Sequence, residues 1–335
     1  MQHSAWKSIV PTMRKTGIKR VIMFKSYKIA DGRVVECPED TIGPIQLYSN
    51  PTDDDRKFLV EECGIDEHTY YSALDEDEIS RVEYEPDHIA VIMKQPRRYN
   101  RDNKLIFRVA SAGVFLFRDK IIIVQADSVP IFEYGKMPLR GNTIPGVLLR
   151  LVYHSTRHFL ENLRIIRSIS DSFENKMENS VTNKALAGIF SLLKGLTYYQ
   201  SATGANQLLL LKLKADARKI GFTEEEIDFL EDITVENKQC DNLAHIYSEI
   251  LNDMSTARVS IVNNTLSNVM KYLALINLVF MPINVLTGMG GMSEFTMMTE
   301  GIWWPYAYSG FFLGAVLIAY ITFLIFKRIG INTHK

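Results

Sequence analysis

The chain is poor in cysteine, and this scarcity excludes two ways of holding a small domain together. Cys37, Cys63 and Cys240 are its only cysteines, and their wide spacing forms neither a disulfide framework nor a zinc-binding pattern. Such usage is typical of a reducing cytoplasm. The net charge of −1 is also close to zero, so the charge balance gives no indication of a nucleic-acid partner.

Catalytic motifs are absent as well. The sequence contains no nucleophile elbow, no phosphate-cradling glycine loop and no metal-hydrolase helix. His154 and His158 stand four residues apart and would share a helix face, but no glutamate completes a zinc motif with them, so we expect polar surface there. The first residues lack an apolar core long enough for a secretory signal, so we expect the N-terminal part to stay on the side of synthesis. The chain is therefore not expected to be an enzyme.

Charged residues are missing from a long stretch near the C-terminus. Residues 303–326 carry no charge and exceed the roughly 20 apolar residues that span a bilayer, and residues 269–288 form a second run of that length. A buried core helix is the alternative for each run, but two adjacent runs favour a membrane hairpin. The segment between them, 289–302, has no lysine or arginine, whereas Lys327 and Arg328 open the tail 327–335. The positive-inside rule then places both termini in the cytoplasm and the short loop outside.

The first part of the chain, residues 1–145, reads as an α/β domain. Short β-branched runs between turn residues predict strands at 18–25, 42–48, 80–84, 88–93, 105–110, 113–117 and 121–125. Thr52 or Asp53 would cap a helix that ends at Gly64. The acidic cluster at residues 75–78 is open to two interpretations, a solvated loop or a site for a hard divalent cation.

From residue 146 onward the apolar residues recur at helical spacing. Residues 146–222 predict a helical hairpin, and Thr223 would cap a new helix with carboxylates in its first turn. No proline occurs between Glu224 and Pro282, and no glycine before Gly288. A single helix of about 60 residues would be roughly 90–95 Å long. We therefore expect a stalk helix at 223–268 that continues into the first span.

Polar and small side chains form one stripe along this predicted helix. Its members are Asn263, Ser267, Met270, Ala274, Asn277, Met281, Asn284 and Gly288. Asparagine in a membrane span is costly unless it faces protein or water. The stripe could join the helix to a neighbour or line a pore. Because one chain with two spans cannot enclose a pore, conduction would require a symmetric oligomer.

The chain resembles the CorA family of divalent-cation transport proteins, to which ZntB-type zinc transporters are related. The resemblance rests on Asn268-Val269-Met270-Lys271-Tyr272-Leu273, Phe280-Met281-Pro282, Gly288 and Gly291-Met292, and on Ile79-Ser80-Arg81-Val82-Glu83-Tyr84. It implies an α+β/α membrane protein with a cytoplasmic α/β domain, a long helical stalk and two C-terminal transmembrane helices. It also implies a funnel-shaped homopentamer in a bacterial inner membrane, with a periplasmic loop at 289–302.

The resemblance also assigns candidate site residues. The pore would be lined by Met270, Asn277, Met281, Asn284 and Gly288. The family's outer Gly-Met-Asn motif aligns with Gly291-Met292-Ser293, so a serine replaces the asparagine thought to hold the hydration shell of Mg²⁺. Glu294, the next residue, could instead supply a ring of carboxylates.

The family's cytoplasmic cation-sensing site lies between subunits, and part of it carries over to this chain. Asp232 aligns on the stalk side, and Asp75 and Asp77 are close to the position on the domain side. A divalent cation would thus be both the transported and the regulatory ion, with no organic cofactor. The implied partners are further copies of the chain and the lipid bilayer.

The expected function is uptake of a divalent cation, Mg²⁺ first and Co²⁺ or Ni²⁺ next. One alternative is a ZntB-like transporter of Zn²⁺. A non-conducting membrane scaffold or sensor is another, and Ser293 keeps that alternative open.

Overall fold

The structure is a computed structural model that divides into two compact units, residues 1–253 and 254–335. The residues that it describes are 23–30, 32–38, 41–101, 104–126, 143–177 and 183–332. Helix α7, Glu224–Gly290, crosses the boundary and therefore contributes to both units. Its 67 residues correspond to about 100 Å of α-helix, in line with the single long helix expected from the sequence.

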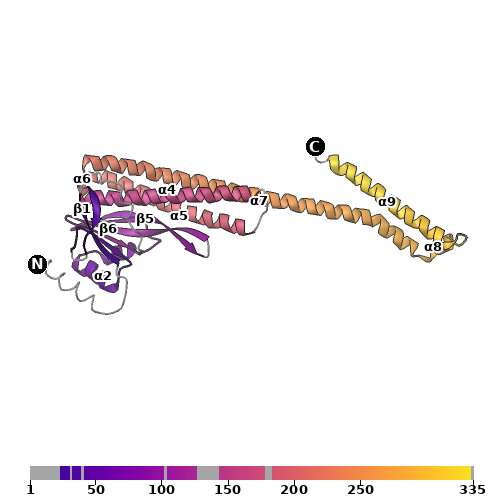
Figure 1. Ribbon diagram of the computed structural model, residues 1–335, viewed down its shortest axis with the longest axis horizontal. Coiled ribbons are helices and arrows are strands. Elements are labelled where there is room, and N and C mark those ends of the chain that lie inside the picture. Colours follow the sequence, from indigo (N-terminus) through magenta and orange to yellow (C-terminus); the bar gives the residue numbers. More distant parts are fainter. Residues whose placement is uncertain are drawn as a thin grey trace. The chain divides into compact units, whose positions relative to one another are not determined.

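The first unit is built on a seven-stranded mixed sheet, whose strands are labelled in part in Figure 1. The strands are β1 Met23–Ala30, β2 Arg33–Glu36, β3 Ile45–Ser49, β4 Arg81–Tyr84, β5 His88–Arg101, β6 Lys104–Phe117 and β7 Ile121–Gln125. Their order across the sheet is β2-β1-β3-β7-β6-β5-β4. Neighbours are antiparallel except β3 and β7, which pair in parallel. Part of the strand expected at residues 18–25 lies outside the described residues.

Both faces of the sheet are covered, and the central strand β7 shows why. Its sequence IIIVQ is buried throughout, as in strands with protein on both sides. Ile121 and Ile123 join the core on one face, whereas Ile122 and Val124 join the core on the other. The continuous β-branched run therefore marks the middle layer of three.

Long helices cover one face, and short helices cover the other (Figure 1). The long ones are α4 Ile144–Met177, α5 Asn183–Ala215 and the start of α7. The short ones are α2 Asp53–Lys57, the π-helix η1 Phe58–Glu62 and α3 Glu67–Ser72. On the short-helix side a Cβ added to Gly113 of β6 would lie 2.4 Å from the Cβ of Ala73, so only glycine permits this close approach.

The prediction of separate strands at 105–110 and 113–117 is wrong, because β6 is one strand through Ser111 and Ala112. Its partner β5 is also longer than the predicted 88–93, since the pairing continues past Lys94 and Pro96 to Arg101. Lysine and proline both look like the end of a strand. Here the Lys94 backbone is held from the helical layer, as described below, and the strand therefore continues.

The predicted helix starts are confirmed. Thr52 caps α2 in a capping box with Asp55. A second box opens α7, where the Thr223 N–H donates to Glu226 at 2.9 Å and the Glu226 N–H donates to the Thr223 hydroxyl at 3.3 Å. Gly221, with φ of +89°, ends the preceding short helix α6 Ala217–Ile220 in the left-handed region that favours glycine.

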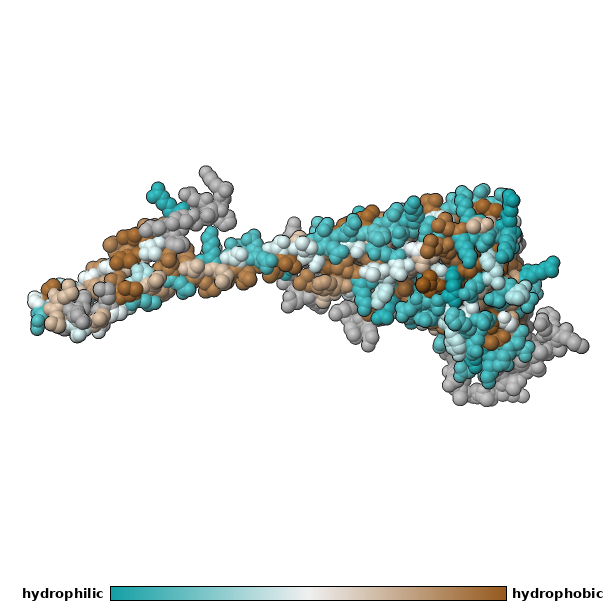
Figure 2. All heavy atoms as spheres, turned by 180° about the vertical axis from the view of Figure 1, so that it is seen from behind, coloured by the Kyte–Doolittle hydropathy of each residue, from teal (hydrophilic) through white to brown (hydrophobic). Residues whose placement is uncertain are grey.

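The second unit holds the end of α7, the short helix α8 Ser293–Met298 and helix α9 Trp304–Asn332. Two stretches among the described residues are long and apolar enough to cross a membrane, one within α7 and the other at Trp304–Leu324. Their large apolar side chains are mostly exposed, in contrast to those of a soluble core. In Figure 2 hydrophobic residues gather over these helices, whereas the visible face of the first unit is mainly hydrophilic.

Candidate functional site on helix α7

The five residues predicted to line a path all lie on one exposed face of α7. Met270 and Met281 are 60% and 66% exposed, and Asn277, Asn284 and Gly288 are exposed as well. At 3.6 residues per turn the five positions fall within an arc of about 60°. The stripe inferred from spacing is therefore a continuous face of a single helix.

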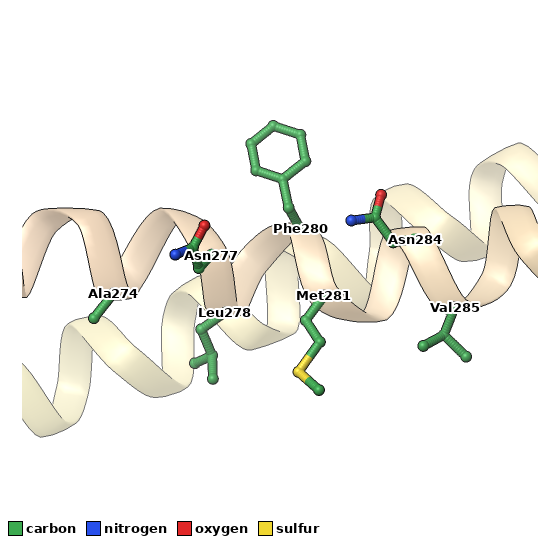
Figure 3. Close-up of a pocket in the computed structure, with 7 residues that line it drawn as sticks. All are labelled: Ala274, Asn277, Leu278, Phe280, Met281, Asn284 and Val285. Carbon is green, nitrogen blue, oxygen red and sulfur yellow. The ribbon is translucent and has the colours of Figure 1, made fainter.

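The opposite side of this part of α7 is partly covered. The less exposed residues are Leu275, Leu278, Val279, Pro282, Ile283 and Leu286. Helix α9, which runs back beside the end of α7 in Figure 1, passes behind it in Figure 3. The less exposed residues of α9 also recur at helical spacing, and Ala315 is buried. Because α9 takes one side of α7, the asparagine face is left open for another partner or for water.

A shallow hollow lies on the open face, and its lining mixes amide and apolar groups. The lining residues are Ala274, Asn277, Leu278, Phe280, Met281, Asn284 and Val285. In Figure 3 both asparagine amides and the Phe280 ring point to one side, whereas Leu278, Met281 and Val285 point to the other. Leu278, Phe280 and Val285 were not predicted as lining residues. The sequence could have indicated them, because each lies one to four residues from an asparagine on the same helix.

The two asparagines are the chemically distinctive groups of this face. Seven residues separate them, which places them two turns and about 10.5 Å apart along the axis. Each carboxamide offers a carbonyl acceptor and two N–H donors. Amides so spaced are able to contact the water shell of a cation, and the Met281 side chain between them is apolar.

The predicted outer motif lies where α7 ends. Gly291 donates its N–H to the carbonyl of Thr287 at 3.1 Å and so continues the helical bonding for one more residue. Met292 is exposed, and Ser293 is the first residue of α8. The backbone of Glu294 lies in α8, but its side chain is outside the described part of the structure. The segment is thus a tight helix–turn–helix connection, and α8 was not foreseen.

The predicted regulatory residues are exposed, and one of them is far from the other two in the sequence. Asp75 and Asp77 lie in the loop between α3 and β4, and Asp232 lies on α7. Among the residues that the structure describes, no group of three or more histidine, cysteine or acidic side chains is placed to hold a metal ion. Within one chain these aspartates therefore do not form a site.

The expectation of polar surface at His154 is wrong. His154 lies partly buried on α4, and its ring centroid is 5.0 Å from that of His158. Burial lowers the pKa of His154 to about 4, and the neighbouring His158, Arg150 and Arg157 lower it further in the same direction. His154 is thus neutral at pH 7, and its ring packs beside that of His158 in the first unit.

The chain is similar to known proteins over most of its length. Residues 47–328 match the family described as CorA-like Mg²⁺ transporter protein. The chain is 25% identical over 321 residues to the cobalt/magnesium transport protein CorA of Methanocaldococcus jannaschii, covering 90% of this chain and 96% of that protein.

Solved structures show the same fold. The complete CorA magnesium transporter from M. jannaschii aligns with a TM-score of 0.73 at 21% identity, over 93% of this chain and 98% of that one. Full-length CmaX aligns with a TM-score of 0.67 at 14% identity, over 83% and 89% of the two chains. The cytoplasmic domain of ZntB from Vibrio parahaemolyticus aligns with a TM-score of 0.56 at 10% identity, over 72% and 99%.

Proposed function

The chain belongs to the CorA family of divalent-cation transporters, and from this premise we propose that it conducts Mg²⁺ into the cytoplasm through a homopentameric pore lined by the asparagine face of α7. It is a membrane protein whose C-terminal helices α7 and α9 are of the CorA type, and it is not an enzyme. The ion, the oligomer and the direction are parts of the proposal.

The observation that carries the proposal is the position of Asn277 and Asn284. Both amides lie in a stretch that is otherwise apolar enough to span a membrane, on the side of α7 away from α9. An amide facing lipid would lose its hydrogen bonds to water at a cost of several kcal/mol. A water-filled axis between copies satisfies both amides and leaves the apolar sides of α7 and α9 to protein and lipid.

Assembly of several copies is supported by the part of α7 just before the span. Its apolar side chains Val259, Ile261, Val262, Leu266 and Val269 are about half exposed, and all but Ile261 fall within an arc of about 80° on the helix. An exposed apolar stripe of this kind on a helix is normally covered by protein or lipid. Neighbouring copies of α7 around an axis would bury these side chains, and the copies would enclose a path that one chain cannot enclose.

The membrane orientation follows from charge. Arg328 lies near the end of α9 and is exposed, and Lys327 precedes it in the sequence. The segment from Gly291 to Gly301 has no basic residue. We therefore place residues 1–268 and 327–335 in the cytoplasm and the connecting segment 289–302 outside a bacterial inner membrane. The membrane potential would then favour cation entry by about 2.3 kcal/mol per charge per 100 mV.

Regulation is proposed at a contact between copies. Asp75 and Asp77 of one copy and Asp232 of its neighbour would share a divalent cation that favours the closed state. Carboxylate oxygens are the ligands that Mg²⁺ prefers. The exposure of all three aspartates supports this arrangement, since each is accessible to a second chain.

One observation favours a second candidate function. Ser293 stands where the family motif has asparagine, and a serine hydroxyl reaches less far toward a hydrated ion than a carboxamide does. A ring of serines would hold hydrated Mg²⁺ less closely at the outer mouth. A Zn²⁺ transporter of the ZntB kind, or a scaffold that does not conduct, would have less need of that contact.

Uptake by proteoliposomes tests the proposal. The natural chain should take up Mg²⁺, and Asn284→Leu should reduce the initial rate by about tenfold or more because it removes an amide from the conducting face. Thr322→Val on α9 is the matched control, since its hydroxyl donates to the carbonyl of Ile318 within its own helix. Unchanged uptake by Asn284→Leu would refute the pore assignment.

A further inference from the structure

The acidic loop between α3 and β4 is already supplied with positive charge from within its own chain. Glu76 accepts from Arg97 at 2.5 Å, and Arg108 approaches its other oxygen at 3.9 Å. Glu78 accepts from Arg81 at 2.6 Å and from the Ser72 hydroxyl at 3.0 Å. Two of the four carboxylates in the cluster are therefore already paired with arginines of the same chain.

Lys94 approaches the same loop from inside the domain. It belongs to β5, only 6% of its surface is exposed, and its ammonium donates to the main-chain carbonyl of Glu76 at 2.5 Å and to the Ser111 hydroxyl at 3.1 Å. Lysine is almost never this buried unless its charge is compensated. Here the compensation comes from the loop itself.

The carboxylates and the lysine act on one another electrostatically. Burial lowers the pKa of Lys94, while Asp77, Asp75, Glu78 and Glu76 act in the opposite direction and favour its charged form. The four acids of the cluster thus all lie within electrostatic range of one buried ammonium. This is the arrangement in which a metal ion would otherwise be expected.

The backbone of Lys94 is fixed by the helical layer. The Asn206 side chain of α5 accepts from the Lys94 N–H at 3.0 Å and donates to the Lys94 carbonyl at 2.8 Å. The Ser155 hydroxyl of α4 donates to the same carbonyl at 2.9 Å. The ammonium that holds the loop therefore starts from a backbone position with three hydrogen bonds to two helices.

We propose that Lys94 is a built-in counter-ion that holds the acidic loop in its folded form without any divalent cation. The loop is then a preformed surface. A divalent ion bound at Asp75 and Asp77 can join two copies of the chain, but it is not needed to order the loop. This inference concerns the cytoplasmic domain and holds whichever cation the membrane part carries.

Hydrogen–deuterium exchange on the full chain in detergent tests the inference, with peptides covering residues 74–80 as the readout. Each protein is measured in EDTA and in saturating MgCl₂. The natural loop should already exchange slowly in EDTA, and with bridging removed by Asp232→Asn it should exchange at the same rate in both. Lys94→Met should exchange about tenfold faster in EDTA, because four carboxylates then lack the buried charge, and MgCl₂ should slow it again. Lys57→Met, which removes an exposed lysine of α2, should behave like the natural chain.

The same measurements in an Asp232→Asn background separate ordering of the loop from bridging between copies. Slower exchange of the otherwise natural loop on addition of MgCl₂ in this background would overturn the inference, as would unchanged exchange in Lys94→Met. If Lys94→Met does not fold, the effect of MgCl₂ on loop exchange in the Asp232→Asn chain still tests the inference. Transport activity does not enter the readout, so the outcome is independent of the pore proposal.

Discussion

The side chain of Asn206 forms hydrogen bonds to both main-chain groups of Lys94, although 112 residues separate the two in the sequence. The same Asn206 oxygen also accepts from the Ser80 hydroxyl at 2.8 Å. One amide of α5 thus fixes β5 and the residue just before β4, with all three residues buried. This contact connects the helical layer to β5 and to the start of β4, the strand that follows the acidic loop.

Replacing Asn206 by alanine should therefore destabilise the first unit strongly. The substitution leaves a buried N–H and a buried hydroxyl without their acceptor, and we expect a loss of about 2–4 kcal/mol. Thermal unfolding of the full chain in detergent, followed by circular dichroism, measures the loss. Gln239→Ala, at an exposed position of α7, is the control and should unfold at the natural temperature. Equal stability of the two variants would contradict the buried network.

Glu226 should be needed to fix the start of α7. It is fully buried, accepts from the Thr223 N–H, and also accepts from the hydroxyl of Thr143, which precedes α4. Glu226→Ala would leave both donors unpaired, at a cost of about 2 kcal/mol. Glu224→Ala removes an exposed acid of the same first turn and should cost less than about 0.5 kcal/mol. Unfolding curves of the two variants, compared with the natural chain, give both values.

Stability should fall on mild acidification because of His154. Its pKa is about 4 in the folded chain and 6.5 in an ordinary environment, so the unfolded chain takes up a proton that the fold disfavours. The resulting loss in the free energy of unfolding is absent above pH 6.5, grows as the pH falls, and is complete below pH 4. At pH 5 it amounts to about 2 kcal/mol. Unfolding of His154→Gln should lose this pH dependence, whereas the exposed His68→Gln should keep it. A natural pH profile in His154→Gln would show that another group is responsible.

The outer motif can be tested by restoring its asparagine. Ser293→Asn should raise Mg²⁺ uptake relative to Co²⁺, Ni²⁺ and Zn²⁺, because a carboxamide reaches further toward a hydrated ion than a hydroxyl does. Uptake of the four cations by the natural chain and the variant is the measurement. Identical cation preference would mean that residue 293 does not contribute to recognition. No uptake of any cation by the natural chain would favour the scaffold function instead.

Local signals predicted the helix starts well, because the determinants are local too. Thr52 with Asp55, and Thr223 with Glu226, form their bonds within four residues, and spacing alone indicates them. The asparagine stripe was predictable for a similar reason, since helical geometry fixes which positions share a face.

Features that depend on distant partners were not predictable. The sequence around Lys94 and Pro96 looks like the end of a strand, but hydrogen bonds from Asn206 on α5 and Ser155 on α4 hold the Lys94 backbone, and β5 continues. His154 is polar in type and four residues from another histidine, but its burial is a property of tertiary packing. Phe280 and Leu278 also line the hollow beside the asparagines. Whether they do so depends on which side of α7 is covered by α9, and the local sequence does not indicate that side.

The parallel pairing of β3 with β7 determines when the domain can fold during synthesis. Residues 45 and 121 are partners in this pair, so the middle of the sheet cannot close until 76 further residues have followed residue 45 out of the ribosome. The core then still lacks Leu230 and Ile233 of α7. At 5–20 residues per second, roughly 7–30 s separate the appearance of β7 from that of the first membrane span. The sheet therefore has time to close before that span requires a bilayer. Once β7 has paired with β3, the edge of β3 is no longer exposed while the chain awaits membrane insertion.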